Sequence, residues 1–203
     1  MAYTIEEEQE INEIKTWWNE NYKSIIAIVV LAFAGVFGWK YWQNHQAGQI
    51  QSLSAQYDQL IYGVEKGDAK NAQLEQFAKD NSKTAYAVLA LFERAKSAVE
   101  NNDFSAAESA LKQAMSESSD EVLTSVAALR LAAVQFQLQS FDAALETLKS
   151  VKDSSWDSRK NLLTGDILAA KGDKAGAKAS FEAALANADQ LEQQLIQVRL
   201  NNL

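Results

Sequence analysis

Residues 101–115 read NNDFSAAESALKQAM, a polar turn followed by a segment in which small and large apolar residues recur at helical spacing. Ala107, Leu111 and Ala114 follow one another at intervals of four and three, which places them on one face of a helix. Small residues let two helices cross closely, and a large residue fills the gap to the neighbouring unit. The stretch therefore predicts the second helix of a helical hairpin.

The same pattern recurs twice further along the chain, in QSFDAALETLKSV and in KGDKAGAKASFEAAL. The equivalent residues are Ala144, Leu148 and Val151 in the first segment, and Ala177, Phe181 and Ala184 in the second. The leading alanines of the three segments are spaced 37 and 33 residues apart. These spacings bracket the period of about 34 residues of the tetratricopeptide repeat, a helix–turn–helix unit.

The helix before each turn carries a small residue twelve positions ahead of the leading alanine: Ala95, Ala132 and Gly165. We predict three in-register repeats and a degenerate fourth near residues 67–68, with Ala72 in the register of Ala107. An ordinary antiparallel helical bundle is the alternative.

Composition supports an all-α chain. Among 203 residues there is no proline and there are only 8 glycines, so the two main helix breakers are scarce. From residue 49 onward, Ala, Leu, Lys, Gln and Glu predominate and no run is typical of a strand. The net charge of −8 argues against nucleic-acid binding, which requires basic patches.

Residues 24–39, SIIAIVVLAFAGVFGW, form an apolar run without a charge. A membrane helix needs about 20 residues, and the flanks supply the rest with aromatic and lysine side chains that favour the membrane–water interfaces. We therefore predict a transmembrane helix over residues 24–42. Its predicted interface residues are Trp17, Trp18, Tyr22, Lys23, Trp39, Lys40, Tyr41 and Trp42.

Two alternatives to a membrane anchor fit the run less well. A buried core helix would show polar residues at a helical period, and none interrupt the run. A cleaved signal peptide has a basic first region, whereas residues 1–23 hold six glutamates against two lysines. Ala34 and Gly38 form a pair that suits close approach of another membrane helix, or they reflect ordinary helix composition.

Lysine placement favours an orientation with the N-terminus inside, since Lys15 and Lys23 precede the run and Lys40 alone follows it closely. In a bacterium this gives an acidic cytoplasmic segment (residues 1–23), a signal-anchor helix (24–42) and a periplasmic repeat domain (43–203).

Little in the sequence favours catalysis. His45 is the only histidine and lies just after the membrane run, so we expect neither a Ser-His-Asp relay nor a histidine-based metal site. GDKAGAK, residues 172–178, lacks the spacing and the preceding strand of a phosphate loop. We predict no enzyme activity and no cofactor.

Helical repeats curve into a surface suited to peptides or partner helices, and the first helix of each unit lines it. Phe92 and Phe136 on this surface can equally be buried between repeats, and Trp156 at a repeat junction is expected to pack there or to contact a ligand. The candidate partner-binding residues are Phe92, Lys96, Val99, Leu129, Ala133 and Phe136.

The sequence resembles the YfgM family of ancillary subunits of the bacterial SecYEG translocon. The resemblance covers the acidic N-terminus, the apolar run closing in GWKYWQNHQ (38–46), and three later stretches: SDEVLTSVAALRLAAVQFQL (119–138), KGDKAGAKASFEAAL (171–185) and RLNNL (199–203). It implies an inner-membrane protein whose periplasmic tetratricopeptide-like domain works with SecYEG, a PpiD-like chaperone and emerging secreted polypeptides. No family catalytic residues exist to be carried over.

Composition and spacing alone support an anchored helical-repeat interaction protein. With the resemblance, three functions stay open: an adaptor that hands translocated polypeptides to periplasmic chaperones, a stress-signalling regulator that binds or sequesters a partner, and a passive assembly subunit that acts mainly through its membrane helix.

Overall fold

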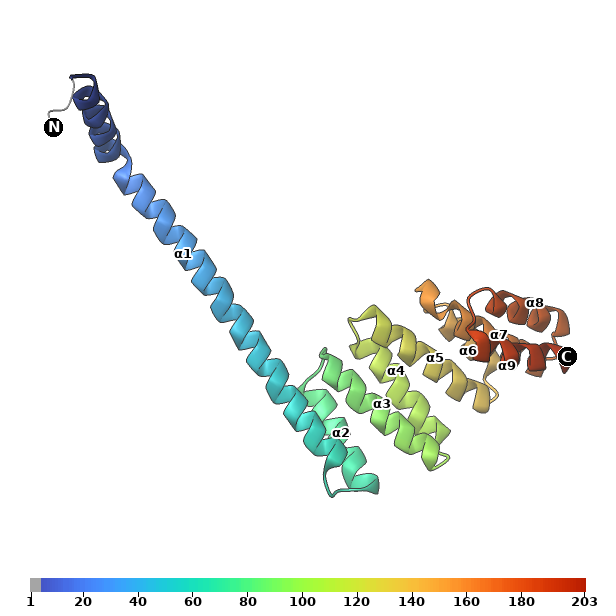
Figure 1. Cartoon of the computed structure of the whole chain (residues 1–203). Helices are drawn as coiled ribbons and strands as arrows, with labels where there is room; N and C mark the ends of the chain where they lie inside the picture. The colour runs from blue at the N-terminus through green and yellow to red at the C-terminus, as the bar shows by residue number, and fades with distance from the viewer. Residues whose placement is uncertain (1–4) are drawn as a thin grey trace. The chain divides into compact units, whose positions relative to one another are not determined.

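The computed structural model describes residues 5–203, with side chains from Gln9 onward. Apart from one short 3-10 turn, η1, the described residues form α-helices joined by short loops, labelled in Figure 1. In order, the elements are α1 (Ile5–Tyr62), α2 (Gly67–Asp80), α3 (Ala85–Glu100), α4 (Phe104–Glu117), α5 (Glu121–Gln137), α6 (Phe141–Leu148), η1 (Ser154–Trp156), α7 (Asp157–Ala170), α8 (Lys174–Leu185) and α9 (Gln190–Asn201).

The chain divides into two units, Met1–Ala55 and Gln56–Leu203. The described part of the first unit consists of α1, which runs without a break through the apolar run and reaches Tyr62 in the second unit. Every residue from 26 to 52 is exposed, and the helix is long and apolar enough to cross a membrane. An apolar surface on all sides of a helix fits a lipid environment.

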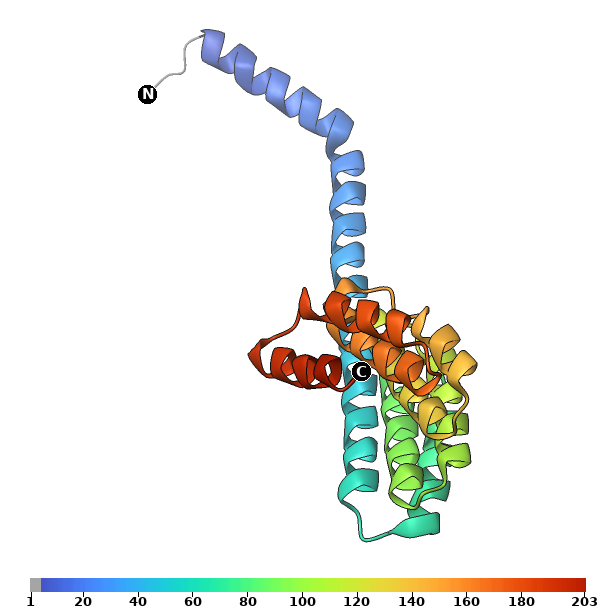
Figure 2. The same cartoon turned by 90° about the vertical axis from the view of Figure 1, so that its right-hand side faces the viewer.

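The second unit is built from helical hairpins, and the prediction of tetratricopeptide-like repeats is confirmed. We call the first helix of each hairpin helix A and the second helix B; the pairs are α3 with α4, α5 with α6, and α7 with α8. Sequence neighbours pack on one another along the unit, as Figure 2 shows for the green and yellow helices. All nine residues predicted for the helix B positions are buried: Ala107, Leu111, Ala114, Ala144, Leu148, Val151, Ala177, Phe181 and Ala184.

The turn between helix A and helix B has the same geometry in all three hairpins. One residue is left-handed, with φ of 60° at Asn102, 57° at Gln139 and 84° at Gly172. The next residue donates its backbone N–H to a carbonyl five positions back, for example from Asp103 to Ala98 at 2.8 Å. This pattern satisfies the free carbonyls at the end of helix A and reverses the chain. Asp103 and Asp173 then cap helix B through their side chains.

The small residues of helix A have the predicted role, most clearly at Gly165. A Cβ atom on Gly165 would lie 2.4 Å from Cε1 of Phe181, so only glycine lets α7 approach the ring on α8 this closely. Ala95 and Ala132 are buried at the equivalent positions. The third hairpin therefore pairs its smallest helix A residue with its largest helix B residue.

The predicted register of the degenerate first repeat is wrong. Ala72 is exposed, whereas Leu74 and Phe77 are buried and lie 37 residues before Leu111 and Ala114. The reason is that α2 begins after Lys66, so Asp68 lies in its first turn instead of capping it. The helix face that packs on α3 is therefore displaced from the one expected.

Candidate partner-binding groove

A groove of about 430 Å³ lies between the helix A elements α3 and α5, over the helix B element α4. Its lining is mainly apolar, with charged groups among it. Four of the six predicted partner-binding residues line it: Phe92, Lys96, Val99 and Ala133. The remaining lining residues are Ala95, Glu100, Phe104, Leu111, Arg130, Val134 and Gln137.

The other two predicted residues, Leu129 and Phe136, lie outside this groove. Both are partly buried and pack against the core of the second repeat. The Phe136 ring also contacts Phe141, with 5.9 Å between ring centroids. Of the six predicted residues, four therefore line the groove and two pack against the core. For Phe136, the alternative of packing inside the repeat domain is the one observed.

Phe92 belongs to the groove but is mostly covered. Its side chain is buried, and the Arg130 guanidinium lies 4.6 Å from the centre of its ring. A guanidinium over an aromatic ring is attracted by the electron-rich face of the ring. Lys96, by contrast, is exposed and lies 3.8 Å from Glu93 on the same helix. The groove therefore offers an apolar lining with charged groups of both signs among its lining residues: Lys96, Arg130 and Glu100.

Reasoning from the sequence missed Arg130, Glu100 and Phe104 because it assigned the surface to fixed positions of helix A only. The groove also includes the last residue of helix A, Glu100, and the first residue of helix B, Phe104. One clue to Arg130 was present: it interrupts the otherwise apolar stretch AALRLAAV. A charge within such a run points to a site where the helix surface meets solvent.

A larger hollow of about 710 Å³ lies between the last turns of α1 and helix α2. Most of its lining residues have polar side chains, including Gln59, Gln73, Gln76 and Asp80. Covering this hollow would desolvate more polar surface than covering the groove, and that costs free energy unless each polar group finds a new partner. Nearby, burial raises the pKa of Tyr57 to about 12, and the Tyr57 ring packs against Phe77 and Tyr86.

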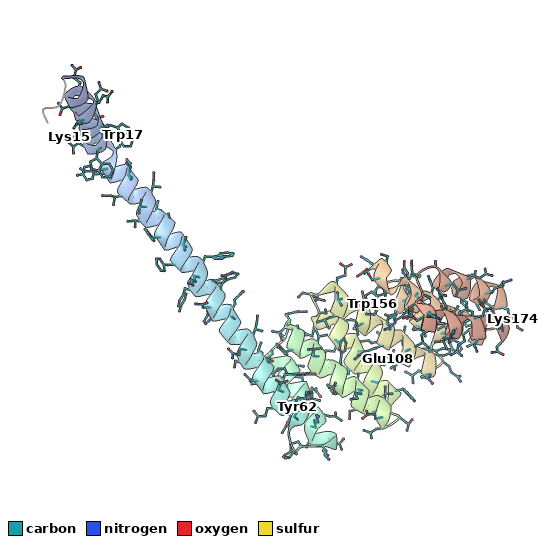
Figure 3. All side chains as sticks on the ribbon, viewed as in Figure 1. Lys15, Trp17, Tyr62, Glu108, Trp156 and Lys174 are labelled. Atoms are coloured by element: carbon teal, nitrogen blue, oxygen red, sulfur yellow. The ribbon has the colours of Figure 1, made fainter. Side chains whose placement is uncertain are left out.

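Polar contacts between repeats fix the helices that form the groove. The buried Gln135 on α5 donates to Glu108 on α4 at 3.1 Å and accepts from Thr147 on α6 at 2.8 Å; Figure 3 labels Glu108. A hydrogen bond from Lys112, with a second from Gln135, holds the pKa of Glu108 below its usual range. A fully satisfied buried amide of this kind specifies one packing of the repeats.

A second polar set connects α7 to α9. Arg199 lies 2.9 Å from Asp166, and Glu192 contacts both Ser158 and Arg159. Burial raises the pKa of Asp166 even though Arg199 opposes the shift. These contacts fix one face of α9 onto the preceding repeat.

The predicted interface residues all lie on α1, where Figure 3 labels Trp17. Seven of them are exposed and Tyr22 is partly buried. The Trp39 and Trp42 rings lie in tilted contact with 5.3 Å between their centroids, and Nζ of Lys23 lies 6.0 Å from the centroid of the Tyr22 ring. Their placement at the two membrane surfaces remains a prediction.

The remaining candidates for chemistry are accounted for by local contacts. His45 lies 3.1 Å from Gln49 and stacks on Tyr41. Trp156 in η1 is half-buried, with Arg159 6.0 Å from its ring. Among the described residues, no cluster of three or more His, Cys, Asp or Glu side chains has the geometry to hold a metal ion.

Comparisons with known proteins agree with this architecture. A family described as a tetratricopeptide repeat-like domain matches residues 15–203. The crystal structure of MamA matches with a TM-score of 0.53 at 15% identity, covering 66% of this chain and 77% of that one, which shows a shared fold.

Curated relatives extend the likeness to the whole chain. Proteins named "Ancillary SecYEG translocon subunit" are 62% identical in Aggregatibacter actinomycetemcomitans and 59% identical in Haemophilus influenzae, each over 100% of both chains. The protein of that name in Escherichia coli is 35% identical over 97% of this chain and 96% of its own. With a long apolar helix followed by tetratricopeptide-like hairpins along its length, the chain belongs to the family of ancillary SecYEG translocon subunits.

Proposed function

We propose that the protein is a membrane-anchored, non-enzymatic adaptor at the SecYEG translocon. Its repeat domain holds emerging polypeptides and helps pass them to periplasmic chaperones, including a PpiD-like one. The observation that carries the proposal is the groove between α3 and α5, a mainly apolar surface with charged residues of both signs, in a domain that follows a helix apolar and long enough to cross a membrane.

The anchor gives the groove its location. Residues 24–42 cross the inner membrane once, with residues 1–23 in the cytoplasm and the repeat domain in the periplasm. The aromatic and lysine residues at both ends of the apolar run support this arrangement, since such side chains favour the two interfaces. The two lysines before the run, against one just after it, support the orientation.

Tethering also explains how a shallow groove can be sufficient to capture a client polypeptide. A binder held beside the exit of a channel meets its client at an effective concentration of roughly millimolar. Weak contact with one or two apolar side chains therefore captures a passing chain, and the same weakness lets a chaperone take it over. A deep pocket would retain the client.

Site-specific photo-crosslinking in cells tests this function. A photoreactive phenylalanine analogue at Val99, on the groove, is expected to capture secreted chains during translocation. The matched control is Val122, an exposed valine on α5 that is not a groove residue. Equal capture at both positions, or capture at Val99 of one resident protein and no secreted chain, contradicts the adaptor function.

Protease added to spheroplasts tests the orientation separately. The repeat domain is expected to be digested while residues 1–23 stay protected. Protection of the repeat domain would place it in the cytoplasm and exclude contact with translocated chains.

A further inference from the structure

One arginine of the repeat domain differs from the others in its contacts. Arg94, Arg159 and Arg199 each lie within 3.2 Å of a carboxylate on another helix. Arg130 on α5 is exposed, and its guanidinium carbon lies 4.6 Å from the centre of the Phe92 ring. Among residues 9–203, whose side chains the structure describes, no carboxylate pairs with Arg130 and no oxygen accepts a hydrogen bond from it. Its five N–H groups are therefore available to a bound molecule.

The repeat register gives a second reason to single out Arg130. Counting 33 residues forward, the step that leads from Ala132 to Gly165, reaches Leu163 on α7. Leu163 and Leu129 both pack against the buried core of the second repeat. An arginine thus occupies, between α3 and α5, a register position that holds a core leucine between α5 and α7. A charged residue in place of an apolar packing residue is typical of a functional site.

The charges of the groove follow one another along α3. Phe92, which contacts Arg130, lies eight residues before Glu100, a separation of about 12 Å along the helix at roughly 1.5 Å per residue. Lys96 lies between these two positions and is paired with Glu93. Glu100 is exposed and has no ion pair in the described part of the chain. The groove therefore has an unpaired positive end at Arg130 and an unpaired negative end at Glu100, with mainly apolar lining between them.

We propose that the groove selects extended polypeptide segments in which an acidic residue and a basic residue lie four positions apart, with an apolar residue midway. In an extended chain every second side chain points to the same face, and four residues span about 13 Å. The acidic side chain then reaches Arg130, the basic one reaches Glu100, and the apolar one lies on the lining between them. This inference rests on the adaptor function proposed above, and it names the class of client segment that the groove takes.

Geometry and solvation both favour such a segment over a purely apolar one. A guanidinium binds a carboxylate through two parallel N–H groups. The contact with Phe92 already restricts the Arg130 side chain, so less conformational freedom is lost on binding. A purely apolar segment would cover Arg130 and Glu100 without offering either a partner, which costs free energy. Because two charge pairs contribute, binding should weaken as the salt concentration rises.

Two peptides that differ only in charge test the selection. One has glutamate, serine, leucine, serine and lysine in that order between glycines, and the other has glutamine in place of both charged residues. Each carries a fluorescent label and is titrated with the full chain in nanodiscs of phosphatidylcholine, a lipid without net charge, with fluorescence anisotropy as the readout. We expect the charged peptide to bind roughly tenfold more tightly than the uncharged one at low salt.

Substitutions locate the selection in the groove. Arg130→Gln is expected to remove the difference between the two peptides, whereas Arg159→Gln, at an exposed arginine outside the groove, preserves it. Ala133→Arg, which narrows the groove, should weaken the binding of both peptides. Equal affinity of the wild-type chain for both peptides, or a difference that persists in Arg130→Gln, overturns the charge selection, and weaker binding to Ala133→Arg would then still support the adaptor function. If neither peptide saturates, or if Ala133→Arg binds both as tightly as wild type, the adaptor function of the groove fails as well.

Discussion

The proposed anchor and the repeat domain contain the same kinds of residue and use them in opposite ways. In residues 24–42 of α1, apolar side chains surround the helix and nearly all of them are exposed. In the hairpins, apolar residues follow one face of each helix and are buried against a neighbour. The difference teaches that apolar content alone does not determine a helix's environment; the periodicity does, because a one-sided pattern needs a partner helix and an all-round pattern needs lipid.

Two phenylalanines give the largest contrast between the regions. Phe181 is 1% exposed and Phe33 is 59% exposed. Phe181→Ala removes a buried ring and is expected to lower the free energy of unfolding of the repeat domain by about 3–5 kcal/mol. Circular dichroism during heating of the full chain in detergent measures this. Phe33→Ala serves as the control and should leave the unfolding temperature of the repeat domain unchanged; an equal loss would remove the distinction between the regions.

A charged residue introduced into residues 24–42 tests whether their exposed apolar side chains lie in lipid. Leu31→Arg places a guanidinium near the middle of the apolar run and is expected to disfavour membrane insertion by about 2.5–3.5 kcal/mol. Alkaline extraction of membranes should then release a larger fraction of the protein. Leu191→Arg, at an equally exposed leucine of the repeat domain, should remain in the membrane fraction. Similar extraction of both variants would show that residues 24–42 do not anchor the chain.

Much of this architecture was predictable, because alanine spacing and polar turns are local features. The leading alanines, the small residues twelve positions earlier and the apolar run were all read directly from residue order, and the burial of Ala107, Ala144 and Ala177 agrees with it. The register of α2 was not predictable from Asp68, since a capping residue and a first-turn carboxylate look alike in sequence.

The groove was only partly predictable, for a different physical reason. Lys96 and Val99 follow from the helix A register, which is a property of one helix. Arg130, Phe104 and Gln137 enter the groove through the angle between neighbouring hairpins, which depends on packing between repeats. Leu129 occupies the register position of Phe92 but packs into a core, so equivalent positions in different repeats have different surroundings.

Two glycines allow the same comparison with smaller expected effects, because Gly165 lies in a close helix contact and Gly35 does not. Gly165→Ala forces a methyl group against the Phe181 ring, and this crowding is expected to lower the free energy of unfolding by about 1–3 kcal/mol. The higher helix propensity of alanine offsets roughly 1 kcal/mol of that loss. Gly35 on α1 has open space around it, so Gly35→Ala should not destabilise the protein. Chemical denaturation measures both variants. A stabilised Gly165→Ala chain would contradict the close contact between α7 and α8.

The smallest expected effect depends on pH. The pKa of Glu108 is lowered in the folded state, chiefly by the hydrogen bond from Lys112, so its ionised form stabilises the repeats. This contribution is present above the usual value of 4.5 and is lost as the pH falls through the lower folded-state pKa. Glu108→Gln should therefore reduce the loss of stability below pH 4.5, measured as unfolding temperature against pH. Lys112→Met should produce part of the same change, and profiles identical to wild type would rule out the link.

The central claim is that the anchor and the groove act together, and a tethering experiment tests it most directly. The photoreactive analogue at Val99 is placed in the full chain and in a version whose residues 1–42 are replaced by a cleaved export signal, so that the same repeat domain is released into the periplasm. Crosslinking to a secretory chain arrested in the translocon is then compared at equal protein amounts. The account predicts strong capture by the anchored chain and at least a tenfold lower yield for the released domain; equal yields, or no capture by the anchored chain, would contradict it.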